Sequence, residues 1–516
     1  MKLFSRLLTF GLAMLMSLST MVACGTSDNH EEESTTTTAA TTTTAAVSDQ
    51  TTTTAATTES PYDVNGYLKD TLDPTLNYNG EEVSILYWND AYNVEFEVEQ
   101  LSGDLVKDAL YNRNSAVEER LGVDLVWTGT PGNNGNQQPY VQTVINDANS
   151  GGEYEIYAGY SMTAATLTLQ GYTRDLMELD HLNFDMPWWP SSLTETTTIK
   201  DRLYFCSGDI STNMIHNIYC IFFNQNMASE LNTADLYALV NDGKWTIDKM
   251  AEYGALAYSD LNGDATVNPE DRFGIALTSN VYFDAFFLGA GLRTVSKDDE
   301  GNLVMAKEFS SDKTVQTLEK VINIFHNNNY AAATATLSSV DKNIFANGRT
   351  LFLVDTFCTA ATFQSADSSL SYGVLPLPKL DETQENYATS MGFPYTLYSV
   401  SRLLSDEKAQ IMGAVLECMA SESHRQVTPA LFELTMKLKY ASGENDSHIY
   451  DLIRDSVYID IGRVFCTPLN NLTYSLFRNA CTEGQTNWTS RIKGESKSFG
   501  KKLDGITKTL DDLAAQ

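Results

Sequence analysis

The sequence predicts an α/β fold with at least two domains, and two observations carry this prediction. Short apolar segments with the character of β-strands alternate along the chain with amphipathic helical segments. The region after residue 60 is roughly 450 residues long, which is more than one hydrophobic core normally serves. The composition is globular, with 42% hydrophobic and 10% aromatic residues.

Each element is predicted from its local pattern. The expected strands are 83–87, 123–127, 155–160, 203–206, 218–223, 273–277 and 351–354, all short and largely apolar. The expected helices are 104–121, 245–258, 315–327, 407–419 and one from about residue 500. Gly122 marks the end of the first helix, and Thr246 is in position to cap the second.

The N-terminus has the pattern of an export signal. Lys2 and Arg6 precede an apolar run that ends at Val22, and these are the charged start and apolar centre of a secretory signal peptide. Residues 21–24 (Met-Val-Ala-Cys) resemble the lipobox of bacterial lipoproteins, with Met21 where Leu is usual. We expect a signal peptide at 1–23, lipidation of Cys24, and a lipid-anchored protein on the extracytoplasmic face of the cell membrane. The alternative is an ordinary signal peptide that leaves Cys24 unmodified.

Residues 24–60 are expected to form a disordered, Thr-rich tether. The unit Thr-Thr-Thr-Thr-Ala-Ala occurs three times in it, and Val47 is its only large apolar residue between 35 and 58. Such a segment buries too little apolar surface to offset the entropy of ordering. A flexible chain of this length spans about 30–35 Å on average.

Charge and cysteine usage exclude some classes of partner. The net charge is −33, and removal of residues 1–23 leaves 32 basic against 67 acidic residues. This balance argues against nucleic acid as a partner and against direct adhesion to anionic lipid. Six cysteines follow Cys24, none in a zinc-binding spacing, and their apolar contexts favour free thiols over disulfides.

Six short sequence motifs, taken in their order along the chain, resemble the family 1 extracellular solute-binding proteins of ABC importers, which include the maltose-binding type. They are 113–123 (RNSAVEERLGV), 187–189 (PWW), 221–226 (IFFNQN), 245–250 (WTIDKM), 345–349 (FANGR) and 372–379 (YGVLPLPK). The resemblance covers most of residues 80–460. It implies a two-lobed, type II periplasmic-binding-protein-like fold whose lobes are joined by hinge strands and close around a ligand.

The resemblance also implies lobe boundaries, a function and partners. The N-lobe is expected at 78–208 plus 392–445 and the C-lobe at 209–391 plus 446–516, with chain crossings near 208–211 and 390–396. The implied protein is a monomer that binds a carbohydrate, most simply an oligosaccharide, and delivers it to membrane permease subunits. It is not an enzyme and uses no catalytic cofactor.

Polar and aromatic residues at strand ends are the candidate ligand contacts, since sugars present apolar C–H faces and rings of hydroxyls. The candidates are Trp88, Asn89, Asp90, Tyr160, Ser161, Asp209, Tyr282, Phe283, Asp355 and Phe357. For each aromatic residue the competing interpretation is a place in the hydrophobic core.

Residues 260–271 resemble the calcium loops of EF-hands and dockerins. The candidate ligands are Asp260, Asn262, Asp264, Thr266 through its carbonyl, Asn268 and Asp271. Ala265 stands where Gly is usual, and Asp271 where Glu is usual. The expected role is a structural Ca²⁺; the alternative is a loop of Asx-turns without metal.

Two alternatives to a transport function remain open at this point. One is a surface-tethered glycoside hydrolase, because carboxylates are abundant enough to form a catalytic pair. The other is a carbohydrate-capturing lipoprotein that is not coupled to transport. The sequence contains no HExxH, phosphate-loop or GxGxxG motif, so none of these motifs identifies a catalytic residue.

Overall fold

The computed structural model describes residues 60–91, 94–338, 340–365, 370–440 and 444–515. Residues 60–516 form one compact unit. The predictions for the signal peptide, Cys24 and the Thr-rich tether lie outside the described residues. Within the described residues, no helix combines the length and the apolar character needed to cross a bilayer.

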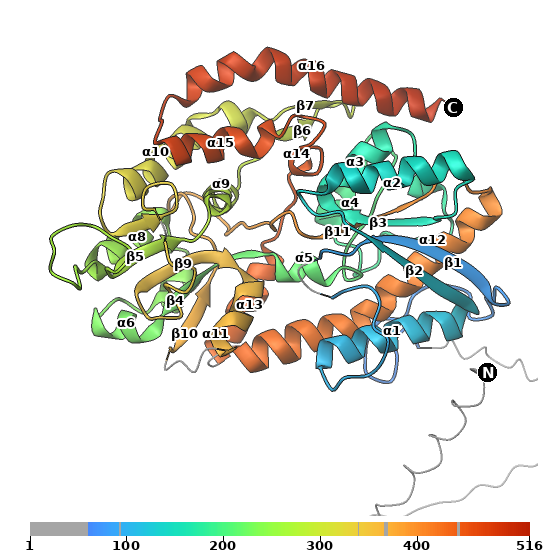
Figure 1. Ribbon diagram of the computed structural model, residues 1–516, viewed down its shortest axis with the longest axis horizontal. Helices are drawn as coiled ribbons and strands as arrows, with labels where there is room; N and C mark the ends of the chain where they lie inside the picture. The colour runs from blue at the N-terminus through green and yellow to red at the C-terminus, as the bar shows by residue number, and fades with distance from the viewer. Residues whose placement is uncertain (1–59, 92–93, 339, 366–369, 441–443, 516) are drawn as a thin grey trace, which may run out of the picture. The chain divides into compact units, whose positions relative to one another are not determined.

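The first lobe, here called the N-lobe, is built on a four-stranded sheet with the order β11-β3-β1-β2 (Figure 1). Its strands are β1 (Glu81–Trp88), β2 (Val123–Thr130), β3 (Ile156–Tyr160) and β11 (Thr396–Val400). β1 pairs in parallel with β2 and β3, whereas β11 returns from far along the chain and pairs antiparallel with β3. The helices around this sheet are α1 (Leu105–Leu121), α2 (Gln137–Ser150), α3 (Ser161–Leu169) and α12 (Asp406–Glu422).

The second lobe, here called the C-lobe, is built on a five-stranded sheet with the order β10-β4-β9-β5-β8. Its strands are β4 (Tyr219–Asn224), β5 (Phe273–Leu277), β8 (Ala331–Ala333), β9 (Thr350–Thr356) and β10 (Tyr372–Leu375). Every residue of these strands is buried, as expected for a sheet covered on both faces. Its helices are α6 (Gln225–Glu230), α7 (Leu236–Asn241), α8 (Ile247–Ala257), α9 (Asp284–Gly289), α10 (Asp312–His326), α11 (Ala360–Ser365), α13 (Glu444–Asp455) and α15 (Leu472–Glu483).

Shorter elements and two long helical segments complete the fold. The short elements are η1 (Leu176–Glu178), α4 (Ser191–Thr197), α5 (Thr212–His216), η2 (Asn280–Phe283), the hairpin β6 (Val295–Lys297) and β7 (Leu303–Met305), η3 (Lys307–Ser310), η4 (Phe357–Thr359) and α14 (Ile461–Val464). The long segments are α12 with its π-helical continuation η5 (Ser423–Val427) and η6 (Pro429–Tyr440), and α16 (Trp488–Ala514). Both contact the two lobes, because η6 meets α1 and α13 while α16 meets α3 and α10.

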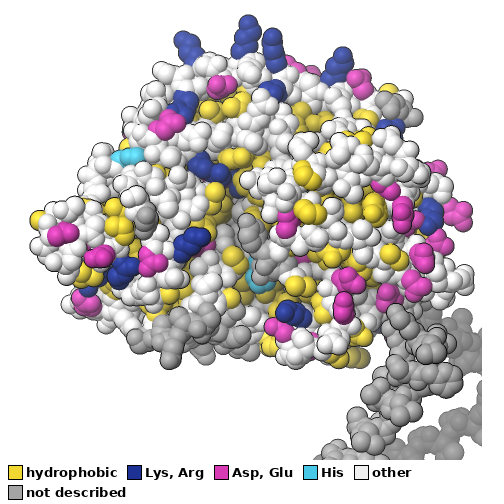
Figure 2. All heavy atoms as spheres, viewed as in Figure 1, with side chains coloured by type: hydrophobic (Ala, Val, Ile, Leu, Met, Phe, Trp, Pro, Cys, Tyr) yellow, Lys and Arg dark blue, Asp and Glu magenta, His cyan; other side chains and the backbone are white. Residues whose placement is uncertain are grey.

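Charge is spread unevenly over the surface. Figure 2 shows Lys and Arg side chains along the edge formed by α16, whereas Asp and Glu side chains gather over the N-lobe. The sequence of α16 contains six Lys and Arg residues between Arg491 and Lys508. The strongly negative net charge is therefore not uniform over the molecule.

The local signals that predicted the elements act as expected. The Asp104 side chain accepts hydrogen bonds from the backbone of Val106 and Lys107 and caps α1, and Gly122 ends that helix in the left-handed region with φ 61°. Thr246 caps α8 through the backbone N–H of Lys249. These interactions satisfy backbone groups that a helix end leaves without partners.

Two predicted elements differ from the structure. The segment 203–206 forms no strand; it is buried and makes one isolated bridge, between Cys206 and Tyr398 of β11. α16 begins at Trp488, so nearly half of this helix precedes residue 500. Three glycines (Gly494, Gly500 and Gly505) lower its intrinsic helix propensity, so packing of its apolar stripe must supply what propensity does not.

A buried carboxylate joins two segments in which the chain passes between the lobes, one before β4 and one before β11. Glu95, in the segment after β1, accepts hydrogen bonds from the hydroxyls of Ser211 and Thr212 (2.9 and 3.2 Å) and from the backbone N–H of Asn213 (2.9 Å). The hydroxyl of Thr396, at the start of β11, donates to the other carboxylate oxygen. One side chain thereby joins segments that are about 185 residues apart. Both segments belong to the predicted crossings.

Candidate binding cavity between the lobes

A cavity of about 410 Å³ lies between the two lobes. Its lining consists of Asn134, Tyr160, Asn217, Tyr219, Ser279, Val281, Tyr282, Thr356, Cys358, Gly392, Phe393, Pro394, Tyr474 and Arg478. These residues come from the ends of β3, β4 and β9, from the loop between β2 and α2, from η2 and the residue before it, from the crossing segments and from α15. The volume suits a small ligand, and its position between lobes is a common one for ligand sites.

Two larger hollows lie elsewhere on the surface. One, of about 960 Å³, lies between α4 and the turn of the β6–β7 hairpin. The other, of about 910 Å³, lies on the C-lobe between the segment 384–388 and α13. Neither is lined by a strand of the two main sheets, so we place the candidate site in the interlobe cavity.

Four tyrosines give the cavity an aromatic lining. Tyr160 ends β3 of the N-lobe, Tyr219 begins β4 of the C-lobe, Tyr282 lies in η2, and Tyr474 lies in α15. The rings of Tyr219 and Tyr282 meet edge to face with their centroids 6.3 Å apart. Such rings offer apolar faces and hydroxyl groups together, which is the combination that a saccharide requires.

Two of the predicted ligand residues line this cavity, one from each lobe: Tyr160 and Tyr282. Asp355 lies behind Tyr282, whose hydroxyl donates to its carboxylate. The same carboxylate accepts hydrogen bonds from the backbone of Thr356 and the hydroxyl of Thr359, both at 2.8 Å. Burial raises the pKa of Asp355, although these hydrogen bonds act in the opposite direction. Burial and Asp355 both raise the pKa of Tyr282.

Trp88 and Ser161 support the cavity from behind its lining. Trp88 is fully buried; its indole N–H donates to the Thr396 hydroxyl at 2.8 Å, and its ring packs against Tyr160 at 5.2 Å. Ser161 is also buried, and its hydroxyl donates to the carbonyl of Phe393 at 2.6 Å. Both therefore position cavity residues rather than line the cavity.

Asn89 and Asp90 lie at the end of β1 beside the loop that carries Asn134. Asn89 is exposed. The Asp90 carboxylate accepts hydrogen bonds from the backbone of Gly132 (3.0 Å) and Asn133 (2.9 Å) and thus orders that loop. Asp90 acts on the cavity through Asn134, which lines it.

The remaining predicted residues lie away from the cavity lining. Phe283 and Phe357 are buried in the C-lobe core. Asp209 is engaged by the ring of His424 at 2.6 Å and by Arg454 at 3.4 Å. The competing interpretation for the aromatic candidates, a place in the hydrophobic core, fits the positions of Phe283 and Phe357.

A buried ion-pair cluster at the cavity was missed by sequence reasoning. Asp284, at the start of α9, binds Arg463 of α14 at 3.0 Å and Arg478 of α15 at 2.6 Å. Arg463 lies over the Phe393 ring at 4.1 Å, and Arg478 lies over the Tyr474 ring at 4.3 Å. Asp284 directly follows the predicted pair Tyr282–Phe283. Its partners are 179 and 194 residues away in the sequence, where the resemblance is weakest.

The loop 260–271 folds as a series of Asx-turns. The Asp260 carboxylate accepts from the backbone of Gly263 (2.7 Å) and Ala265 (2.8 Å), and the Asp264 carboxylate accepts from the backbone of Thr266 (2.7 Å). Ala265 has φ 58°, so the position that is usually Gly adopts the left-handed conformation despite its Cβ.

Asp271, the last residue of the loop, is fully buried. Its Oδ2 accepts from the backbone of Asn268 (3.1 Å) and the hydroxyl of Tyr258 (3.3 Å). Its Oδ1 is buried and has no hydrogen-bond partner among the described residues. The same part of the chain contains no group of three or more His, Cys, Asp and Glu side chains gathered as a metal site. In the loop, amide and carbonyl oxygens make up half of the candidate ligands, and a buried, unpaired carboxylate oxygen fits a cation.

No protein-family model matches the sequence, and no curated protein matches it. Solved structures do match. The sugar-binding protein MalE of Xanthomonas citri has a TM-score of 0.56 and 11% identity, over 82% of this chain and 98% of that one. The cyclic α-maltosyl-1,6-maltose-binding protein of Arthrobacter globiformis has a TM-score of 0.52 and 12% identity, over 83% and 100%.

A third similar structure, UgpB of Mycobacterium tuberculosis in complex with glycerophosphocholine, has a TM-score of 0.52 and 14% identity, over 84% of this chain and 98% of that one. At these identities the likeness concerns the fold. The predicted two-lobed α/β architecture is confirmed, and the chain shares its fold with these three proteins.

Proposed function

We propose that this chain is the solute-binding component of an ABC importer and binds a carbohydrate, most simply an oligosaccharide, between its lobes. The observation that carries the proposal is the tyrosine-rich interlobe cavity, in which Asn134, Asn217 and Ser279 add amide and hydroxyl groups. Similar structures from X. citri and A. globiformis are described as sugar-binding proteins. The M. tuberculosis structure holds glycerophosphocholine, so the fold alone leaves the ligand class open.

The mechanism is capture, hinge closure and docking, without covalent chemistry. Tyr160 from the N-lobe and Tyr282 from the C-lobe contact different parts of a bound saccharide. Movement of the lobes about the two crossing segments encloses it. A lipid at Cys24 and the 24–60 tether keep the protein near the permease, so the effective concentration there is high and a modest affinity suffices.

Binding is favoured over glycoside hydrolysis by the state of the carboxylates at the cavity. Hydrolysis needs one carboxylic acid and one carboxylate that both reach the glycosidic bond. Asp284 is held by two guanidinium groups, and Asp355 by three hydrogen-bond donors. A lipoprotein that captures carbohydrate without a permease would use the same cavity. The presence or absence of importer permease genes next to the gene of this protein distinguishes that alternative from the proposed function.

A thermal-shift screen over neutral and acidic mono- and oligosaccharides tests the proposal, with chromatography of each mixture for products. We expect at least one saccharide to raise the melting temperature with no product formed. Tyr282→Ala should lower the affinity for that saccharide about 10-fold, because a stacked ring contributes about 1 kcal/mol in addition to the free energy of burying its surface. Tyr62→Ala, at an exposed site outside the cavity, is the matched control. Release of product, or stabilisation by peptides alone, would overturn the proposal.

We also propose that the loop 260–271 binds a structural Ca²⁺. Asp260, Asn262, Asp264, Asn268 and Asp271 would hold it through side-chain oxygens, with the carbonyl of Thr266. The buried, unpaired Oδ1 of Asp271 supports this proposal. The ion would fix the connection between α8 and β5.

A further inference from the structure

The charged groups around the interlobe cavity are not balanced. Arg478 is the one charged residue among the described residues that line it. Its Nε and Nη2 donate to the two carboxylate oxygens of Asp284 at 2.9 and 2.6 Å, and Arg463 donates to the same carboxylate at 3.0 Å. Two guanidinium groups therefore share one carboxylate, and the cluster carries one net positive charge.

The third nitrogen of Arg478 is available to a ligand. Within the described part of the chain, Nη1 donates no hydrogen bond. It is also not one of the buried polar atoms without a partner, so part of its surface is accessible. The side chain is 16% exposed and lies over the Tyr474 ring. Arg478 lines the cavity, and Asp284 and Tyr474 fix its orientation, so a hydrogen bond from Nη1 to a ligand carries little cost for ordering a flexible side chain.

The nearby carboxylates do not offer a matching negative surface. The Asp284 side chain is only 3% exposed because both arginines cover it. Asp355 lies behind Tyr282, and its carboxylate is occupied by Thr356, Thr359 and that tyrosine. A ligand in the cavity thus meets a positive group and neutral hydrogen-bonding groups.

We propose that the cavity takes a saccharide that carries an anionic group, a carboxylate or a phosphate, and that Arg478 binds this group. The inference rests on the proposed carbohydrate-binding function and specifies its ligand class. The strongly negative net charge of the chain repels anions at long range. At physiological ionic strength that repulsion is screened beyond about 8 Å, so the local charge of Arg478 decides recognition inside the cavity.

Titration calorimetry on the full chain without its signal peptide tests this inference with matched ligands. The probes are tetragalacturonate and its neutral counterpart, glucuronate-containing and neutral glucose oligosaccharides, and the corresponding sugar phosphates. We expect an acidic saccharide to bind about 10- to 100-fold more tightly than its neutral counterpart, as a charge-assisted hydrogen bond provides. Comparison of the affinities for the uronate-containing saccharides and for the sugar phosphates then identifies which anionic group is bound.

Arg478→Gln is the decisive variant, because Arg463 remains paired with Asp284 and no carboxylate is left without a partner. It should abolish the preference, so that the acidic saccharide and its neutral counterpart bind this variant with affinities within about 2-fold of each other. Arg478→Lys keeps the charge and should retain part of the preference. Arg491→Gln on α16, where the arginine pairs with Glu483 outside the cavity, is the matched control.

The outcomes separate this inference from the proposed function. A neutral saccharide that binds as tightly as its acidic counterpart, or an equal loss of both in Arg478→Gln, overturns the inference and leaves the carbohydrate-binding function standing. Binding of no saccharide in either series overturns both. A preference for acidic saccharides that persists in Arg478→Gln also overturns the role of Arg478.

Discussion

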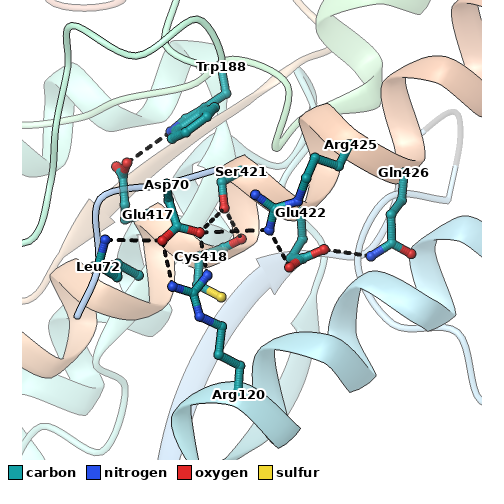
Figure 3. A network of polar contacts seen from close by, with 10 residues as sticks. All are labelled: Asp70, Leu72, Arg120, Trp188, Glu417, Cys418, Ser421, Glu422, Arg425 and Gln426. Atoms are coloured by element: carbon teal, nitrogen blue, oxygen red, sulfur yellow. Dashed lines mark hydrogen bonds and ion pairs between the residues drawn. The ribbon is translucent and has the colours of Figure 1, made fainter. Parts of the chain in front are cut away.

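The side chains of Glu417 and Asp70 are both buried, but their pKa values are shifted in opposite directions (Figure 3). Glu417, on α12, accepts the indole N–H groups of Trp188 (3.1 Å) and Trp189 (2.8 Å), which carry no charge. Burial therefore dominates and raises its pKa to about 7. Burial acts in the same direction on Asp70, but hydrogen bonds and attraction from Arg120 outweigh it and lower the pKa of Asp70.

Glu417 makes the protein less stable as the pH rises through neutrality. Its folded-state pKa of about 7 lies above the ordinary value of 4.5, so its stabilising contribution is complete below that value and is lost as the pH rises through 7. The free energy of unfolding of wild type should fall relative to Glu417→Gln by about 2–3 kcal/mol between pH 5 and pH 8. Urea unfolding at several pH values measures this. Glu119→Gln, at an exposed site on α1, should leave the wild-type slope unchanged, and identical slopes in all three proteins would contradict the prediction.

Asp70 shows the opposite dependence. Its carboxylate binds both terminal nitrogens of Arg120 and the Ser421 hydroxyl, and its side chain is 1% exposed. Asp70→Asn should lower the free energy of unfolding by about 3 kcal/mol at pH 7, because it leaves a partly buried guanidinium without its counter-charge. This loss should shrink below pH 3.8, where the contribution of a carboxylate with a lowered pKa disappears. Asp73→Asn, in the exposed part of the same segment, is the control, and equal losses from both variants would be inconsistent with this account.

At the scale of elements, local pattern predicted most strands and helices because their signals are contained in a few neighbouring residues. The cap at Thr246 and the stop at Gly122 are examples. The segment 203–206 was predicted as a strand because it is short and apolar, but burial alone accounts for those residues. The start of α16 was predicted too late because its stability comes from apolar contacts with β7 and both lobes, which no local window contains.

The candidate site was predicted less completely than the fold. Tyr160 and Tyr282 were among the candidates because they lie at or near the ends of predicted strands, and both line the cavity. Tyr474 and Arg478 were not, since α15 reaches the cavity only through the folding of a C-terminal segment with a weak resemblance. Phe283 has the same residue type and almost the same position as Tyr282, yet it is buried in the core. Which of two adjacent aromatics faces a cavity depends on the turn that η2 makes, and composition does not specify it.

The Ca²⁺ site proposed in the loop 260–271 gives a prediction at the scale of elements. Chelation with EDTA in calcium-containing buffer should lower the melting temperature by about 3–5 °C, because the ion binds the folded loop and not the unfolded chain. Differential scanning calorimetry measures the shift. Asp260→Ala should remove the response to EDTA, whereas Asp299→Ala, at an exposed turn of the β6–β7 hairpin, should keep it. An unchanged melting temperature in wild type would show that the Asx-turns alone hold the loop.

At the scale of the whole molecule, a cluster of buried groups joins the two crossing segments to the N-lobe wall of the cavity. Glu95 holds both crossing segments, and buried Arg113 donates to the carbonyls of Glu95 (3.1 Å) and Ile210 (3.5 Å). The hydroxyl of Thr396 joins this cluster to Trp88, which packs beneath Tyr160. The hinge ends and the N-lobe wall of the cavity thus share one rigid support.

This arrangement predicts a closure that depends on contacts from both lobes. Adding a saturating amount of the tightest-binding saccharide from the screen should decrease the radius of gyration in small-angle X-ray scattering, because only a closed form contacts the saccharide with Tyr160 and Tyr282 together. Tyr282→Ala, held at saturation by a higher saccharide concentration, should close less completely, since its C-lobe contact is missing. Tyr62→Ala should behave as wild type. Unchanged scattering at a saturation verified by calorimetry would mean that the saccharide binds without lobe movement, and delivery would then need a different signal to the permease.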